Sequence, residues 1–246
     1  MNKYSDFLIR KMTMSKAEAG EKISEVSVRA ACTLLKNRQD IERIRMLILV
    51  TQEADFLFPS TAFVVHKELG LSQYCMVYDI NLGTDGFLSA LEQAAGLLIP
   101  YKDEEALVVA ADSLEAVAAV VGHEEGIEAE FYHYTDPGSW HMIWGSRWDK
   151  DYRIDLELFR QRVEMSEKQF MKHRDGHKND CVVAPQCGMY EEIKDSPTMI
   201  PAEIVQKSKE IDKDVIYCSC MGCGAGISVA EAYIAVKREG IIYDGC

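Results

Sequence analysis

Residues 79–87 read DINLGTDGF, and this stretch decides the fold class. The apolar, extended residues that lead into it end at Gly83, and after Gly86 the pattern FLSALEQAAGLL is typical of a helix. A strand that stops at a glycine and passes the next side chain to a helix N-terminus is one way in which folds display a nucleophile. The stretch therefore predicts an α/β fold with a candidate catalytic corner at Thr84.

The composition is that of an ordinary globular protein, with 246 residues, of which 48% are hydrophobic and 27% charged. The net charge of −13 argues against a nucleic-acid partner, because such affinity comes mainly from neutralising phosphates with Lys and Arg. The N-terminal residues contain no apolar run long enough for a signal peptide, and no later segment approaches a membrane span. We therefore expect a cytoplasmic protein without a membrane partner.

Hydrophobic periodicity divides the chain into two halves, 1–122 and 123–246, that repeat one order of elements. The first half is expected to contain a helix over 23–36, a buried strand over 45–52, a proline-started helix over 59–71, a strand over 74–81, a helix over 87–98 and apolar strands over 105–113 and 115–121. The second half is expected to contain a helix over 156–172, a strand over 180–186, a helix from Pro201, a strand over 214–220, a glycine-rich corner over 221–226 and a helix over 227–240. The repeat predicts two similar sheets about an internal pseudo-twofold axis, with both glycine corners near the centre.

Two motifs in the first half resemble a known family. The stretch ILVTQEADFLFPSTAFVVHKELGL (48–71), followed by YDINLGTDGFLSALEQA (78–94), is similar to the ketoacyl-ACP synthase III group of the thiolase superfamily. The resemblance is dense from about Ser5 to Ser113 and weaker from Glu157 to Gly240. It implies a thiolase-like fold with two pseudo-repeated halves in α/β/α/β/α layers, the second half truncated, and it implies no cofactor and no metal.

The resemblance does not extend to the chemical positions. The family has a cysteine at the corner, where this chain has Thr84, and a hydroxyl without a neighbouring base is a poor acyl acceptor. Pro185 falls at the histidine position and Cys223 at the asparagine position. The resemblance therefore implies that no ordinary Claisen condensation takes place in this chain. We favour a helix-capping role for Thr84 and Asp85 over catalysis, and a relocated thiol at Cys187 or Cys223 stays an alternative.

The motifs that the chain retains imply a partner. In the family, the strand that leads to the corner joins two subunits, and the residue before the proline of the F-P-S stretch enters the neighbour's acyl pocket. The residues that match interface or pocket positions are Phe58, Pro59, Asp79, Gly83 and Phe87. By comparison with the family, we expect the chain to lack the family's first strand and the last two strands of its second half.

These features favour a non-catalytic subunit of an active ketoacyl synthase III-like enzyme in fatty-acid-like or polyketide biosynthesis. An acyl carrier protein or acyl-CoA would carry the substrate. The alternatives are an acyltransferase or thioester hydrolase with a non-standard nucleophile, and a non-catalytic module that binds acyl-CoA or carrier protein.

Three further features stay open. Cys218, Cys220 and Cys223 have metal-ligand spacing, with Cys187 or Cys246 as a fourth ligand, but alternation along a buried strand explains the first two better. Trp140, Trp144 and Trp148 would form one stripe on a helix. The basic segment 167–178 is either a solvated helix end or a docking site for an acidic carrier.

Overall fold

The computed structural model describes residues 1–56, 58–135, 143–145, 152–154, 156–184, 196–224 and 228–243. Its main sheet has nine strands in the order β3-β2-β4-β5-β1-β10-β9-β8, and β11 pairs with β1. These strands are β1 (Asn2–Lys16), β2 (Ile44–Val50), β3 (Met76–Ile80), β4 (Glu105–Ala111), β5 (Glu115–Thr135), β8 (Cys181–Val183), β9 (Val215–Gly224), β10 (Ser228–Lys237) and β11 (Ile241–Ile242). The short strands β6 (Ile143–Gly145) and β7 (Tyr152–Ile154) form a separate antiparallel pair.

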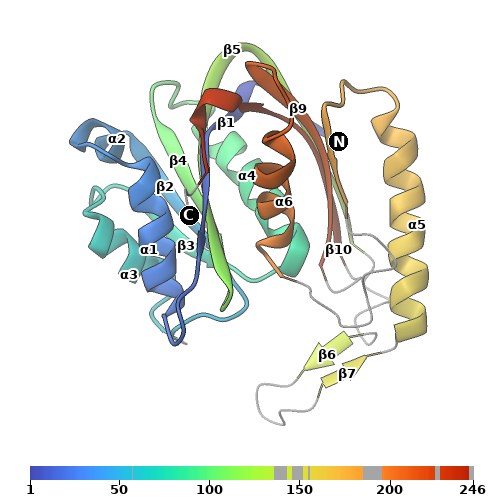
Figure 1. Ribbon diagram of the computed structural model, residues 1–246, viewed down its shortest axis with the longest axis horizontal. Helices are drawn as coiled ribbons and strands as arrows, with labels where there is room; N and C mark the ends of the chain where they lie inside the picture. Colours follow the sequence, from blue (N-terminus) through green and yellow to red (C-terminus); the bar gives the residue numbers. More distant parts are fainter. Residues whose placement is uncertain are drawn as a thin grey trace.

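Helices cover both outer faces of the sheet and fill its centre (Figure 1). The helices are α1 (Ile23–Leu34), α2 (Arg38–Glu42), α3 (Thr61–Leu69), α4 (Gly86–Leu98), α5 (Leu156–Arg174) and α6 (Met199–Ser208), with the 3₁₀ turns η1 (Gly83–Asp85) and η4 (Arg238–Gly240). Helices α4 and α6 lie between the two parts of the sheet, α1 and α3 lie outside the first part, and α5 lies outside the second (Figure 1). This is the α/β/α/β/α layering that the sequence resemblance implies.

Each helix layer contributes its own apolar contacts with the sheet. In the central core, Phe87 and Leu91 of α4 share one cluster with Ile204 of α6 and with residues from both parts of the sheet. The helices α1 and α3 pack in a second cluster on β2, β4 and β5. Phe170 of α5 packs in a third cluster with Tyr233. Because fully buried strands are apolar on both faces, these layers explain the unbroken apolar runs in the sequence.

The two parts of the sheet repeat one arrangement. In the first, α4 leads into the antiparallel hairpin β4–β5, and β5 pairs with β1. In the second, α6 leads into the antiparallel hairpin β9–β10, and β10 pairs with the far end of β5, from Tyr233 opposite Glu130 to Ser228 opposite Thr135. The predicted boundary between 122 and 123 lies within β5, so one strand serves both halves.

The structure corrects several sequence-based predictions. The segment 227–240, predicted as a helix, contains β10 and η4, because its residues pair along their length with β9 and are buried on both faces. The closing strands of the second half are therefore present as β9 and β10. The first strand is also present, as β1. Helix α3 begins at Thr61 rather than at Pro59, which follows a cis peptide bond, and α6 begins at Met199, two residues before Pro201.

Candidate functional site

The corner at the start of α4 has the geometry that the sequence predicts. Gly83 has a positive φ of 60°, which favours glycine, and it begins the 3₁₀ turn that leads into α4. A Cβ atom at Gly86 would lie 2.5 Å from Val50 Cγ1, so only glycine allows α4 to start this close to β2. These two glycines place Thr84 beside the N-terminus of a buried helix.

Thr84 is held by the backbone of β9. Thr84 is buried, with 2% of its surface exposed. The Thr84 hydroxyl donates a hydrogen bond to the Cys223 carbonyl oxygen at 2.9 Å and accepts one from the Cys223 N–H at 2.9 Å. The N-terminal cap residue of α4 is Asp85, without a side-chain hydrogen bond to the helix. The predicted helix-capping role is therefore wrong, and the Thr84 hydroxyl instead connects the two halves of the molecule.

Two residues of the second half complete the corner, namely Ser228, to which the sequence analysis gave no role, and Gly222, which belongs to the predicted glycine-rich run. The Ser228 hydroxyl donates a hydrogen bond to Oδ2 of Asp85, which is 1% exposed. A Cβ atom at Gly222 would lie 2.4 Å from the Thr84 carbonyl oxygen and 2.6 Å from the Asp85 Cα. Glycine at 222 therefore lets β9 lie directly on the corner, so the glycine-rich run reaches the centre as predicted, but its residues 221–224 belong to strand β9 and not to a second corner. The signal in the sequence is the MGCGAG run that follows a buried strand.

Of the other predicted catalytic positions, Cys223 reaches this corner through its backbone, which binds the Thr84 hydroxyl. Pro185 and Cys187 lie outside the described residues. Cys223 is buried, and it packs with Phe170 and Tyr233 in the cluster beneath α5. Its match with the family's asparagine depended on a helix that follows the glycine run, and a strand follows instead.

Asp79 positions a helix. Its two carboxylate oxygens each accept a 2.8 Å hydrogen bond, from the N–H groups of Thr61 and Ala62 at the start of α3. The Thr61 hydroxyl accepts a hydrogen bond from the Asp55 N–H. The Asp55 carboxylate in turn accepts hydrogen bonds from the first two N–H groups of α1. The motif around DFLFPS thus fixes the start of both outer helices, a role that the sequence analysis did not assign to Asp55.

The predicted interface residues divide into surface and core. Phe58 is 90% exposed beside the exposed Pro59, whereas Phe87 is fully buried in the central core. Strand β3 ends the sheet order. Further exposed large apolar side chains occur on β3, on α3 and in the adjoining loops, namely Phe56, Phe63, Tyr74, Met76 and Leu82. We call these five residues together with Phe58 the β3 patch.

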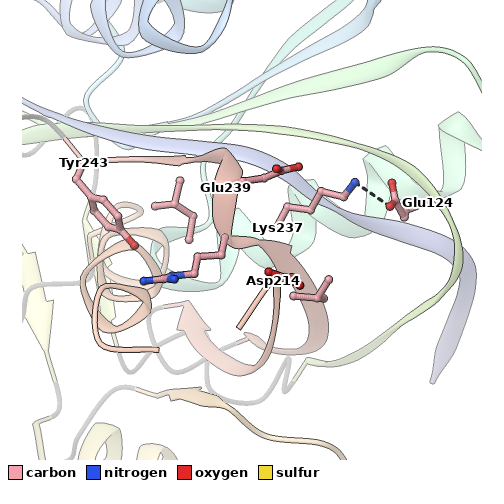
Figure 2. A pocket seen from close by; sticks show the side chains of 8 residues that line it. Glu124, Asp214, Lys237, Glu239 and Tyr243 are labelled. Carbon is pink, nitrogen blue, oxygen red and sulfur yellow. Dashed lines mark ion pairs between the residues drawn. The ribbon is translucent and has the colours of Figure 1, made fainter. Parts of the chain in front are cut away.

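A cavity of about 650 Å³ lies at the opposite ends of β9 and β10 from the corner, and Figure 2 shows its lining. It is lined by Glu124, Asp214, Val215, Lys237, Arg238, Glu239, Ile241 and Tyr243. The Lys237 ammonium forms a 2.7 Å ion pair with Glu124 across it. At about 3.3 Å per residue, the strands separate this cavity from the corner by roughly 25–30 Å. Two smaller cavities, of about 390 and 140 Å³, also have no corner residue in their linings.

The cysteine-rich strand gives no metal centre in the part of the chain that the structure describes. Cys218 and Cys220 lie on β9 with their side chains in the central core, which confirms their alternation along a buried strand. Cys246 lies outside the described residues. Of the predicted tryptophan stripe, Trp140 and Trp148 also lie outside them, and so does the side chain of Trp144. The backbone of Trp144 is in strand β6 and not in a helix. Among the described helices, none has the length and apolar character of a membrane span.

Comparisons with known proteins agree with this geometry, although no family model matches the chain. Over 102 residues it is 30% identical to β-ketoacyl-[acyl-carrier-protein] synthase III of Neisseria gonorrhoeae, and this aligned region covers 41% of this chain and 32% of that protein. Over 99 residues it is 34% identical to the synthase III of Oleidesulfovibrio alaskensis, covering 40% of this chain and 30% of that protein. The match thus spans about a third of the length of these curated relatives.

Solved structures match nearly the whole chain. A 3-oxoacyl-(acyl-carrier protein) synthase from Burkholderia xenovorans superposes with a TM-score of 0.83 at 17% identity, covering 98% of each chain. A variant of OleA from Xanthomonas campestris superposes with a TM-score of 0.76 at 15% identity, covering 95% of this chain and 97% of that one. Likeness at this identity shows the fold alone, and the sequence matches cover about two fifths of this chain. The chain has a thiolase-like fold and is similar to ketoacyl-ACP synthase III over that part of its length.

Proposed function

We propose that this chain is a non-catalytic, condensing-enzyme-like subunit that supports an active ketoacyl synthase III-like partner in acyl-thioester condensation, within fatty-acid-like or polyketide biosynthesis. One observation carries the proposal. The residue at the nucleophile corner is Thr84, which is 2% exposed and whose hydroxyl both donates to and accepts from the backbone of Cys223.

The chemistry of Thr84 supports this reading. An acyl acceptor at such a corner has to lose its proton and present a free lone pair to a thioester carbonyl. The Thr84 proton points to a backbone carbonyl oxygen, which is not a general base, and the Cys223 N–H already binds to its oxygen. Attack by this hydroxyl would require its proton to leave the Cys223 carbonyl oxygen for a base, inside a buried junction.

The surface around β3 supports a partner. An edge strand with exposed apolar side chains is a site where another sheet or chain adds. Within the β3 patch, Met76 lies on this edge strand and Tyr74 and Leu82 flank it in the chain, while Phe58 at 90% exposure is the most exposed member. We propose that the active subunit joins at β3 and receives Phe58 in its acyl pocket. Because the net charge is −13, an acidic acyl carrier protein would dock mainly on the partner.

Affinity purification from the native organism tests the proposal. The tagged chain is expected to recover a synthase that has a cysteine at its own corner, in a 1:1 complex by sedimentation analysis. Phe58→Ala is expected to reduce this recovery. Leu114→Ala is the matched control, because Leu114 is also an exposed apolar residue but lies in the β4–β5 turn, outside the β3 patch.

Intact mass spectrometry after incubation with acyl-CoA separates the alternatives. The isolated chain is expected to gain no covalent acyl group. An adduct that disappears in Thr84→Val, or one that maps to Cys223 or Cys187, would instead make the chain an acyltransferase or hydrolase. Saturable binding of acyl-CoA by a chain that recovers no synthase would make it a binding module.

A further inference from the structure

Two thiols face each other across neighbouring strands of the central core. Cys181 on β8 and Cys218 on β9 are register partners in a parallel pair. They are 3% and 1% exposed and belong to the same apolar cluster. Neighbouring strands lie about 4.8 Å apart, and the Cα atoms of a disulfide lie roughly 4.4–6.8 Å apart. The backbone spacing therefore suits a bond between these two sulfurs.

The two thiols have different chemical roles. The hydrogen bond from the Cys218 thiol lowers the pKa of Cys181, although burial acts against this. The same hydrogen bond, together with burial, raises the pKa of Cys218. Cys181 is thus the sulfur that ionises first, and Cys218 is the thiol that donates to it. A nucleophilic thiolate beside a second thiol is the arrangement of a reactive dithiol.

We propose that Cys181 and Cys218 form a reversible disulfide on exposure to a peroxide, and that this bond fastens β8 to β9. The inference does not depend on the proposed function. The Cys181 thiolate attacks one peroxide oxygen, the O–O bond breaks, and the departing hydroxide takes up the Cys181 proton as water. The Cys218 sulfur then attacks the Cys181 sulfenic acid, the S–O bond breaks, and the hydroxyl leaves with the Cys218 proton as a second water. Two thiols are oxidised and one peroxide is reduced.

The position of β8 allows the reaction. Among the described strands, β8 has three residues and ends the sheet order, and we expect such an edge to open more easily than the middle of the sheet. It pairs with β9, its Val182 carbonyl oxygen accepts a 2.6 Å hydrogen bond from Lys207 Nζ, and Cys181 and Val183 pack in the central core. Peroxide is small enough to enter such an opening, and the reaction is expected to be slow. The disulfide closes the loop between 181 and 218, which restricts the unfolded chain.

Peptide mapping tests the proposal directly. The reduced chain is treated with hydrogen peroxide, the remaining thiols are blocked with N-ethylmaleimide, and the digest is examined by mass spectrometry. The peptides that contain Cys181 and Cys218 are expected to be linked, the intact mass to fall by two hydrogen atoms, and dithiothreitol to reverse both changes. The unfolding midpoint of the oxidised chain is expected to rise by several degrees.

Alanine variants assign the roles and keep the apolar surroundings. In Cys218→Ala, Cys181 is expected to stop at the sulfenic acid and to be trapped by dimedone. In Cys181→Ala, Cys218 is expected to form neither a link nor a dimedone adduct. Cys220→Ala, which removes the buried thiol two residues from Cys218, is the matched control and should keep the link. A link between other cysteines, or no link at a dose that fully oxidises the exposed Cys32, would overturn the proposal.

Discussion

Replacement of Thr84 by valine tests whether the corner residue is a structural link. Valine keeps the shape of the side chain but removes both 2.9 Å hydrogen bonds to the Cys223 backbone. A hydrogen bond of this kind contributes about 1 kcal/mol net, so the free energy of unfolding should fall by about 2 kcal/mol. With an m-value near 3 kcal/mol per M, the urea midpoint should fall by roughly 0.7 M.

Equilibrium unfolding in urea, followed by circular dichroism, measures this change. Thr84→Ser is the control, because serine keeps the hydroxyl and loses only a methyl group, which is worth about 0.8 kcal/mol or less. Valine is therefore expected to be the more damaging substitution. If valine were as stable as the wild type while serine were weaker, the methyl group would be the stabilising part and the reasoning on the hydroxyl would fail.

Three further predictions concern glycines, a carboxylate and a thiol. Gly222→Ala should destabilise the chain by about 1–3 kcal/mol, because its Cβ would meet backbone atoms of the corner. Gly96→Ala, in α4 with only ordinary contacts, should be neutral or slightly stabilising in the same urea assay. Burial opposes ionisation of Asp180, but hydrogen bonds from Lys213 and from the Tyr217 N–H lower the pKa of its carboxyl. The ionised carboxylate therefore stabilises the fold above about pH 4, and this contribution disappears as the pH falls through the pKa of the folded state. Asp180→Asn should therefore flatten the loss of stability measured by urea titrations below pH 4. Burial raises the pKa of Cys75 to about 11, so its rate of alkylation by iodoacetamide, read by peptide mapping, should still increase about tenfold per pH unit between pH 8 and 10; a plateau in that range would contradict the shift.

Local chemistry made most of the first half predictable. The strands β2, β3 and β4 are apolar runs flanked by turn residues, and α4 follows two glycines that the backbone requires. The corner begins at Gly83, whose positive φ favours glycine, and Gly86 follows three residues later. These glycines lie in one short stretch, so the sequence contains the signal of the turn, although the contacts that complete the corner are long-range.

Long-range pairing explains what the sequence did not reveal. Strand β1 mixes charged and apolar residues, and its partners are β5 and β10, more than a hundred residues away. The segment that forms β10 contains alanines and charged residues at helical spacing, and only its hairpin with β9 makes it a strand. The partner of Thr84 is 139 residues distant. Patterns within one segment contain no information about such a partner, so the hydroxyl's role could not be predicted.

Under the proposed function, one physical explanation covers both the threonine at the nucleophile position and the retained corner. The turn that displays a side chain beside α4 also forms the junction where the two halves meet, through Thr84 with Cys223 and through Asp85 with Ser228. A thiol at position 84 would be a weak donor and a weak acceptor, whereas a hydroxyl does both well. Threonine therefore strengthens the junction at the position where cysteine would supply reactivity. In the proposed subunit, which would rely on a partner for chemistry, the turn, the glycine at 222 and the hydroxyl keep a structural role, because together they hold the two halves in register.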